Sequence, residues 1–195
     1  METTALQTEL NIVLLLAFLC MLAGRSLAMR KRGIRAIVFG KTDKRDFLLV
    51  LVVLLLVYPA IAKAAGLPMW SLLLEPFWDT PAPGWVGLAL CVLAIVGFAA
   101  SLKSFGDSFR VGIDVERPDK LVTTGMFAYS RNPLYLCIIL FFTGSFLTHR
   151  NIVVLAALII FLLAINRQIR REEDFLKKHY GAEFDDYCEK VRRFI

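Results

Sequence analysis

Long apolar runs constrain this chain more than any other feature of its sequence. The cleanest covers residues 85–102 and holds no charged side chain. As a helix rising about 1.5 Å per residue it would extend roughly 27 Å, close to the bilayer hydrocarbon thickness of about 30 Å. Hydrophobic residues make up 57% of the chain and the mean hydropathy is +0.62, too apolar for an ordinary soluble domain. We therefore expect an all-α integral membrane protein.

Five runs are candidates for spans or near-spans: 12–24, 47–62, 85–102, 134–147 and 152–165. The last two are separated by only four residues, so we expect a helical hairpin, with Asn151 as the N-cap of its second helix. We treat 1–195 as a single membrane domain. In it, 1–103 supplies three N-terminal spans, and 104–195 supplies a cytoplasmic loop, the hairpin and C-terminal amphipathic helices.

Charge distribution predicts the orientation. The basic cluster Arg30-Lys31-Arg32 and the polar segment 104–132 are expected on the cytoplasmic side. The Trp-rich connection 68–84, which lacks Lys and Arg, fits the outer face. The N-terminus then lies outside and the C-terminus in the cytoplasm. The first nine residues lack the basic start of a cleavable signal peptide, so we expect the first run to be retained.

Two polar regions are expected to have defined structure. Alternating apolar residues over 109–115 suggest a small extended hairpin inside the polar segment. The charged tail from 166 onward is expected to be helical, with an apolar stripe that also includes Glu173, and to break at Gly181. A second amphipathic stripe follows. Its members are Phe184, Tyr187, Cys188 and Val191.

Arg131, Asn132 and Tyr135 stand where a polar loop meets an apolar helix. An arginine beside a helix N-terminus is well suited to hold a carboxylate or phosphate. The simpler alternative is that Arg131 only reaches toward lipid phosphates, while Pro133 only begins a helix. Spacing alone leaves both interpretations open.

Glu172 and Glu173 form the second polar cluster. An exposed, salt-bridged helix would explain them, since Arg170 and Asp174 are four residues apart. Glu173, however, falls on the apolar stripe, where a carboxylate needs a diol, an ammonium or an arginine as partner. A hairpin of the two preceding runs would return this cluster to the end that holds Arg131.

Other chemistries find no support in the sequence. It contains no nucleophile triad, phosphate-binding loop or metal-ligand spacing, so we expect no metal site. The four scattered cysteines are expected to be small buried hydrophobic residues. The net charge of +6 is interpreted as an orientation signal, and we expect no nucleic-acid partner.

The ordered set of motifs resembles the isoprenylcysteine carboxyl methyltransferase and phospholipid methyltransferase superfamily of integral membrane enzymes. The matching pieces are Phe105-Gly106-Asp107-Ser108-Phe109, Lys120-Leu121-Val122 with Gly125, Arg131-Asn132-Pro133-Leu134-Tyr135, Glu172-Glu173, Tyr180-Gly181, Tyr187 and Arg193-Phe194. The resemblance implies S-adenosyl-L-methionine as cofactor, held between the hairpin and the C-terminal helices, with a lipid-facing tunnel opposite. It implies that Arg131 and Glu173 serve catalysis. The pocket it implies is formed by Lys120, Leu121, Val122, Gly125, Arg131, Asn132, Pro133, Tyr135, Glu172 and Glu173.

This resemblance makes methylation of a membrane-embedded lipidic substrate the leading expectation, with an isoprenylcysteine-like carboxylate ahead of a phosphatidylethanolamine-type amine. Where the family usually has Arg-His-Pro, this chain has Asn132, which does not titrate near neutral pH. Two other interpretations stay open. One is a sterol-reductase-like enzyme that uses NADPH, and the other is a non-enzymatic membrane scaffold. The oligomeric state is not predicted.

Overall fold

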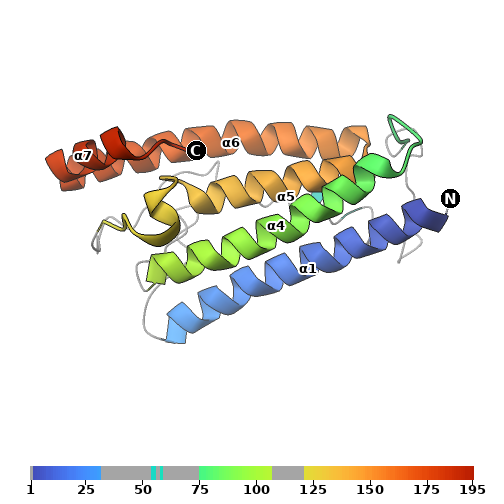
Figure 1. The fold of residues 1–195 in the computed structure, drawn as a ribbon, viewed down its shortest axis with the longest axis horizontal. Coiled ribbons are helices and arrows are strands. Elements are labelled where there is room, and N and C mark those ends of the chain that lie inside the picture. Colours follow the sequence, from blue (N-terminus) through green and yellow to red (C-terminus); the bar gives the residue numbers. More distant parts are fainter. Residues whose placement is uncertain (1, 32–53, 56–57, 59–74, 107–120) are drawn as a thin grey trace.

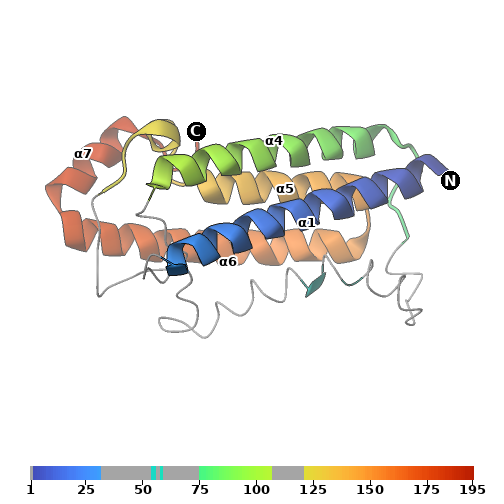
Figure 2. The ribbon, with the colours of Figure 1, turned by 90° about the horizontal axis from the view of Figure 1, so that it is seen from below.

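The computed structural model describes residues 2–31, 54–55, 58, 75–106 and 121–195. In order, the elements are α1 (Glu2–Lys31), α4 (Ala82–Phe105), the short 3-10 helix η3 (Gly125–Ala128), α5 (Pro133–His149), α6 (Ile152–Tyr180) and α7 (Ala182–Lys190). The long helices lie side by side, and α7 folds back at one end (Figures 1 and 2). The all-α prediction is confirmed for the described residues.

In the described part of the chain, three helices are long and apolar enough to cross a membrane: Thr3–Lys31, Ala82–Phe105 and Ile152–Tyr180. The shorter apolar helix α5 accompanies them. Four of the five predicted runs are therefore helices, each somewhat longer than the apolar run that predicted it. The second predicted run, over 47–62, lies almost entirely outside the described residues, as does the predicted extended hairpin at 109–115.

The predicted hairpin consists of α5 and α6. Pro133 begins α5 in the first turn, where its missing N–H costs no helical hydrogen bond. Arg150 ends this helix in the left-handed conformation, at φ 46°. The Asn151 side chain then accepts a hydrogen bond from the Val154 N–H, 3.0 Å away. Asn151 is therefore the N-cap of α6, as predicted.

The apolar run and the charged tail form one continuous helix of 29 residues. At about 1.5 Å per residue it extends roughly 44 Å, so its last turns continue beyond a hydrocarbon core of about 30 Å. Gly181, at φ 56°, ends α6 where predicted. A single rigid helix thus carries Glu172 and Glu173 from the apolar bundle to its polar end.

Two facing glycines bring α4 and α5 into close contact. A Cβ on Gly87 would lie 2.4 Å from the Gly144 carbonyl oxygen, and a Cβ on Gly144 would lie 2.4 Å from the Gly87 carbonyl oxygen. Small residues at facing positions allow membrane helices to approach at backbone distance. This contact fixes where the start of α5 lies relative to the end of α4.

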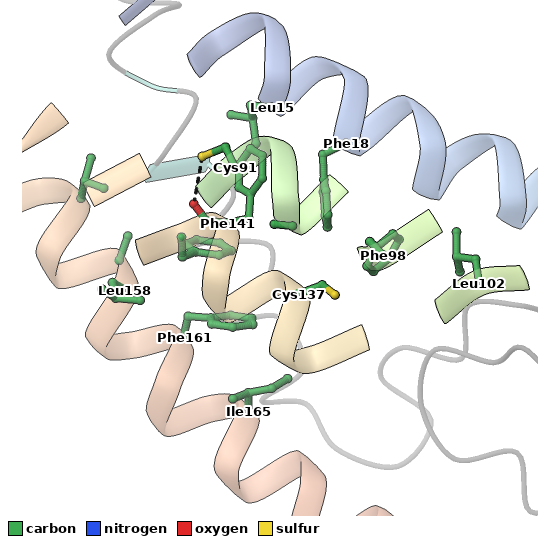
Figure 3. Close-up of a cluster of buried hydrophobic side chains, with 14 of the residues drawn as sticks. Leu15, Phe18, Cys91, Phe98, Leu102, Cys137, Phe141, Leu158, Phe161 and Ile165 are labelled. Carbon is green, nitrogen blue, oxygen red and sulfur yellow. Dashed lines mark hydrogen bonds between the residues drawn. The ribbon is translucent and has the colours of Figure 1, made fainter. Parts of the chain in front are cut away.

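Aromatic and aliphatic side chains fill the space between the helices (Figure 3). Phe142 and Phe161 stack across α5 and α6 with ring centroids 4.6 Å apart. Cys91 and Cys137 are buried here, as expected for small hydrophobic residues. Cys20 is exposed instead, because it lies on an outer face of α1, where a bilayer supplies the apolar surroundings.

A buried polar network attaches α1 at the end of α5 far from Pro133. The Asn11 amide donates to the Ser145 hydroxyl over 3.2 Å, and His149 Nε2 donates to the Asn11 side-chain oxygen over 3.0 Å. Buried polar groups in an apolar bundle are stabilised by such mutual bonds. His149 therefore has a partner at this end of the bundle, away from both charged clusters.

The glycine contact gives a direct test of the fold. Gly144→Ala should separate α4 and α5 and lower the stability by about 1–3 kcal/mol, the usual cost of overpacking a filled interior. Thermal unfolding in detergent measures this. Gly24→Ala is the control, because a Cβ at Gly24 meets no atom within 4 Å. Equal melting temperatures for both variants would contradict the close contact.

Candidate functional site

The polar end of the bundle collects segments that are far apart in the sequence. The end of α4, the 121–132 loop with η3, the start of α5, the last turns of α6 and α7 all lie there (Figure 1). The C-terminal residues 191–195 run back from α7 to the start of α5. There the Arg131 N–H donates a hydrogen bond to the Arg192 carbonyl oxygen over 3.0 Å. Both charged clusters predicted from the sequence are in this region.

Arg131 and Glu173 form an ion pair across the hairpin. The Arg131 Nη2 and Glu173 Oε1 atoms are 3.2 Å apart, and each side chain is only 15% exposed. Partial burial strengthens such a pair relative to one in open solvent. Glu173 is thus held on the apolar stripe of α6 by an arginine, one of the partners the sequence suggested.

A second bridge lies beside the first. The Tyr135 hydroxyl donates to Glu172 Oε1 over 2.6 Å, and the Gln168 amide donates to the same oxygen over 2.9 Å. Gln168 lies one helical turn before Glu172 on α6. Tyr135, in the first turn of α5, follows Arg131 by four residues in sequence. The start of α5 and the last turns of α6 are therefore joined twice, so the predicted meeting of the two clusters is confirmed.

Arg193 also belongs to this charged cluster, although the sequence analysis assigned it no role in the site. Its Nε donates to Glu173 Oε1 over 3.2 Å, and its Nη2 donates to Glu173 Oε2 over 2.5 Å. These bonds raise the pKa of Arg193 above its ordinary value. The motif match alone marked Arg193, because no local spacing relates the chain end to α6.

The chain end is also held through its backbone. The Ser130 hydroxyl and the Asn132 side-chain amide both donate to the Arg193 carbonyl oxygen, over 3.3 and 3.2 Å. Asn132 is buried, with 8% of its surface exposed. Its amide nitrogen is therefore engaged with the chain end, between Arg131 and the fully buried Pro133.

Gly125 has a conformational and a packing role. Its φ of 64° is left-handed, and a Cβ there would lie 2.4 Å from the Ser104 hydroxyl oxygen. That hydroxyl accepts the Met126 N–H over 3.0 Å, which attaches η3 to the end of α4. Sequence reasoning did not single out Ser104.

The remaining predicted residues lie at the edge of the same region. Leu121 packs against the α7 cluster of Phe184, Tyr187 and Val191. Val122 is partly buried beside it, whereas Lys120 lies outside the described residues. The second predicted stripe is thus present, and it supports the segment that precedes η3.

One donor in the cluster has no acceptor among the residues that the structure describes. Within the described structure the Arg131 Nε atom is buried and makes no hydrogen bond. A buried donor without a partner costs about 1–3 kcal/mol, so an acceptor oxygen placed there would be stabilising. A small molecule with a carboxylate and cationic or hydroxyl groups would match the arginines and glutamates of this cluster. No group of three potential metal ligands occurs in the part of the chain that the structure describes.

Comparison with known proteins matches residues 83–183, about half of the chain, to the family described as phospholipid methyltransferase. Relatives include a probable protein-S-isoprenylcysteine O-methyltransferase of Oryza sativa subsp. japonica, 26% identical over 60% of this chain and 62% of its own length. The nickel-cobalt-cadmium resistance protein NccN of Alcaligenes xylosoxydans xylosoxydans is 27% identical over 60% of this chain and 54% of its own.

An uncharacterized protein of Haemophilus influenzae is 38% identical over 32% of this chain and all of its own length. The chain spans between about half and two thirds of the NccN and rice relatives, at 54% and 62%. The family match covers α4, η3, α5 and α6 and ends just inside α7. It therefore includes both bridges between α5 and α6 but not Arg193.

The support of the site by α7 can be tested through Tyr187, whose hydroxyl donates to the Phe127 carbonyl oxygen over 2.6 Å. Burial raises the pKa of Tyr187 to about 12, and the nearby Arg131 charge opposes this. The unfolded chain releases this proton near pH 10. Tyr187 therefore contributes stability that is complete below about pH 10 and is lost as the pH rises toward about 12.

Tyrosinate absorbance of the wild type minus that of Tyr187→Phe should show one component titrating near pH 12 in the folded protein. In denaturant the same component should titrate near pH 10, which is about the ordinary pKa of tyrosine. A difference titration near pH 10 in the folded protein would contradict the buried hydroxyl.

Proposed function

The chain belongs to the phospholipid methyltransferase family, and we propose that it binds S-adenosyl-L-methionine between the start of α5 and the last turns of α6. The substrate we propose is a lipidic molecule that enters from the bilayer and carries an isoprenylcysteine-like carboxylate. The observation that carries this proposal is the double bridge of Arg131 with Glu173 and of Tyr135 with Glu172, beside a buried Arg131 Nε that has no hydrogen-bond partner among the described residues.

Arg131 is the residue we assign to the cofactor carboxylate. It uses Nη2 for Glu173, which leaves Nε directed toward no acceptor within the described residues. A carboxylate oxygen at Nε would complete the fork of donors that a guanidinium presents. The helix N-terminus at Pro133 adds a favourable field for a negative group.

The two glutamates suit the other groups of the cofactor, its ammonium and its ribose hydroxyls. Glu172 accepts hydrogen bonds from Tyr135 and Gln168 at its Oε1 atom. Those bonds fix its side chain at low cost in conformational entropy when a ligand binds. Leu121, Val122 and Gly125 would border the bound cofactor from the loop side.

When bound, S-adenosyl-L-methionine supplies an electrophilic methyl group on its sulfonium. The contribution of the chain is then to align the acceptor with that group and to exclude water. The buried or half-buried side chains between α4 and α5, including Phe105, Phe127 and Phe98, make the inner side of this region apolar.

Asn132 bears on the class of acceptor. It stands where the family usually has histidine, and its amide is bonded to the Arg193 carbonyl oxygen, so it offers no base. A carboxylate acceptor is already ionised at neutral pH. An ammonium acceptor would have to lose a proton first. This difference favours O-methylation over N-methylation.

A phospholipid amine is the second candidate, and the family description itself favours it. The name of the rice relative, a probable protein-S-isoprenylcysteine O-methyltransferase, favours the carboxylate instead. The NADPH alternative predicts heat on titration with NADPH and none with S-adenosyl-L-methionine.

We also propose that the site faces the cytoplasm. Arg25, on α1, donates to the Gly106 carbonyl oxygen, so the last turns of α1 lie at the end of the bundle that holds the site. Arg30 and Lys31 are in that last turn. A cluster of basic residues at one membrane boundary is typical of the cytoplasmic side.

Arg131→Ala should weaken S-adenosyl-L-methionine binding by about 10- to 100-fold, because a hydrogen bond to a charged group is worth roughly 1.5–3 kcal/mol and Glu173 loses one of its two arginine partners. Isothermal titration of the purified protein in detergent measures this. Arg170→Ala is the control, since Arg170 is exposed on the same stretch of α6. Normal binding by Arg131→Ala would refute the assignment.

Methyl transfer to a carboxylate gives an ester, which mild base hydrolyses to methanol, whereas a methylated amine is stable to base. With methyl-labelled cofactor and native membranes, we expect the lipid-extractable label to become volatile after base treatment. Mass spectrometry should show the gain of one methylene on one co-purifying lipid species. Base-stable label would instead indicate the phospholipid amine.

A further inference from the structure

The carboxylate of Glu173 is shared unequally between two arginines. Arg193 contacts both oxygens through Nε and Nη2 and so forms a bidentate pair. Arg131 contacts only Oε1, through Nη2, and its Nε makes no hydrogen bond within the described chain. The same carboxylate could accept a bidentate fork from Arg131, because the Nε and Nη2 donors of arginine match a carboxylate. Arg193 occupies the position that would allow this.

Arg193 is placed by Arg131 and its two neighbours in sequence, Ser130 and Asn132. The Ser130 hydroxyl and the Asn132 amide donate to the Arg193 carbonyl oxygen, and the Arg131 N–H donates to the Arg192 carbonyl oxygen. Phe194 packs against the main apolar core. The chain end is therefore a strap, residues 191–195, that crosses the start of α5 and points the Arg193 guanidinium at Glu173.

The two arginine side chains differ in how much of their surface is exposed. The Arg193 side chain is 38% exposed, whereas that of Arg131 is 15% exposed. An outer, partly hydrated pair contributes little to global stability. Loss of the Arg193 side chain should thus leave the fold intact while it changes how Glu173 and Arg131 contact each other.

We propose that Arg193 is a positioning residue for ligand binding: by holding Glu173 in a bidentate pair, it keeps the Nε of Arg131 available for the carboxylate of the cofactor. The inference rests on the proposed function above. Without Arg193, Glu173 turns to accept both Nε and Nη2 of Arg131, so the donor that the ligand needs is already occupied. Asn132 supports this arrangement by fixing the backbone of Arg193.

The first test measures S-adenosyl-L-methionine affinity by titration for Arg193→Ala, Arg193→Lys and the control Arg192→Ala, an exposed neighbour on the same strap. Arg193→Ala should weaken binding about tenfold, the size of a coupled contact. Arg193→Lys should recover only part of this, because lysine lacks the planar fork. Arg192→Ala should bind as the wild type does.

Damage to the fold by Arg193→Ala would also lower the affinity for S-adenosyl-L-methionine. The action of Arg193 through Glu173 is therefore tested by repeating the measurement in a Glu173→Gln background. If Arg193 acts through Glu173, Arg193→Ala should change the affinity there by less than about twofold, since mutations along one contact path are not additive. An equal loss in both backgrounds, or wild-type affinity in Arg193→Ala, would overturn the proposal.

A second readout needs no cofactor. In the ligand-free protein, a double-mutant cycle of Arg131→Ala and Glu173→Gln gives the coupling energy between these two residues by thermal unfolding. This coupling energy should be larger in the Arg193→Ala background than in the wild-type background, because the Arg131–Glu173 pair then becomes bidentate. An unchanged or smaller coupling overturns the role of Arg193 by itself. If the wild type binds no S-adenosyl-L-methionine, the proposed function fails, and a larger coupling would still show that Arg193 controls Arg131.

Discussion

A charged side chain at the edge of a bilayer has to be paired, and this requirement explains the polar end of the molecule. Arg131 lies just before α5 enters the apolar bundle, and Glu173 lies on the apolar stripe of α6 that packs against the other helices. Without Glu173, Arg131 would be a partly buried charge that lacks this compensation, which is costly. Together they join the start of α5 to the last turns of α6, and the other contacts of the site are arranged around that pair.

The positions of these two residues depend on distant features of the fold. Facing glycines fix α5 against α4, and one unbroken α6 carries the glutamates beyond the apolar part of the bundle. At the opposite end, Asn11 and His149 hold α1 to α5 through buried hydrogen bonds. The polar end therefore rests on rigid helices, which suits a site that must hold a ligand in a defined orientation.

Membrane methylation places two demands on such a site. It must bind a water-soluble, charged cofactor, and it must meet an acceptor that resides in lipid. A boundary where exposed polar loops, half-buried charges and an apolar bundle meet satisfies both. In the proposed reaction Asn132 would offer no base, which suits a carboxylate acceptor because a carboxylate, unlike an ammonium, has no proton to lose.

The sequence by itself determined the helical membrane architecture, since apolar runs of span length can satisfy their backbone groups in lipid only as helices or closed barrels. It also determined the Pro133 and Asn151 helix starts, the Gly181 break and the stripe that carries Glu173, because caps and periodicity act over a few residues. Motif order then identified Arg131 and the glutamates as candidates.

Only the tertiary structure decided which of these charges pair, and that Arg193 and Gln168 join them. Arg193 lies 20 residues from Glu173 in sequence and its carbonyl oxygen bonds a side chain 61 residues away. Such contacts depend on the relative placement of packed helices. No periodicity within one segment encodes that placement, because it follows from how the side chains of several segments fill a shared interior.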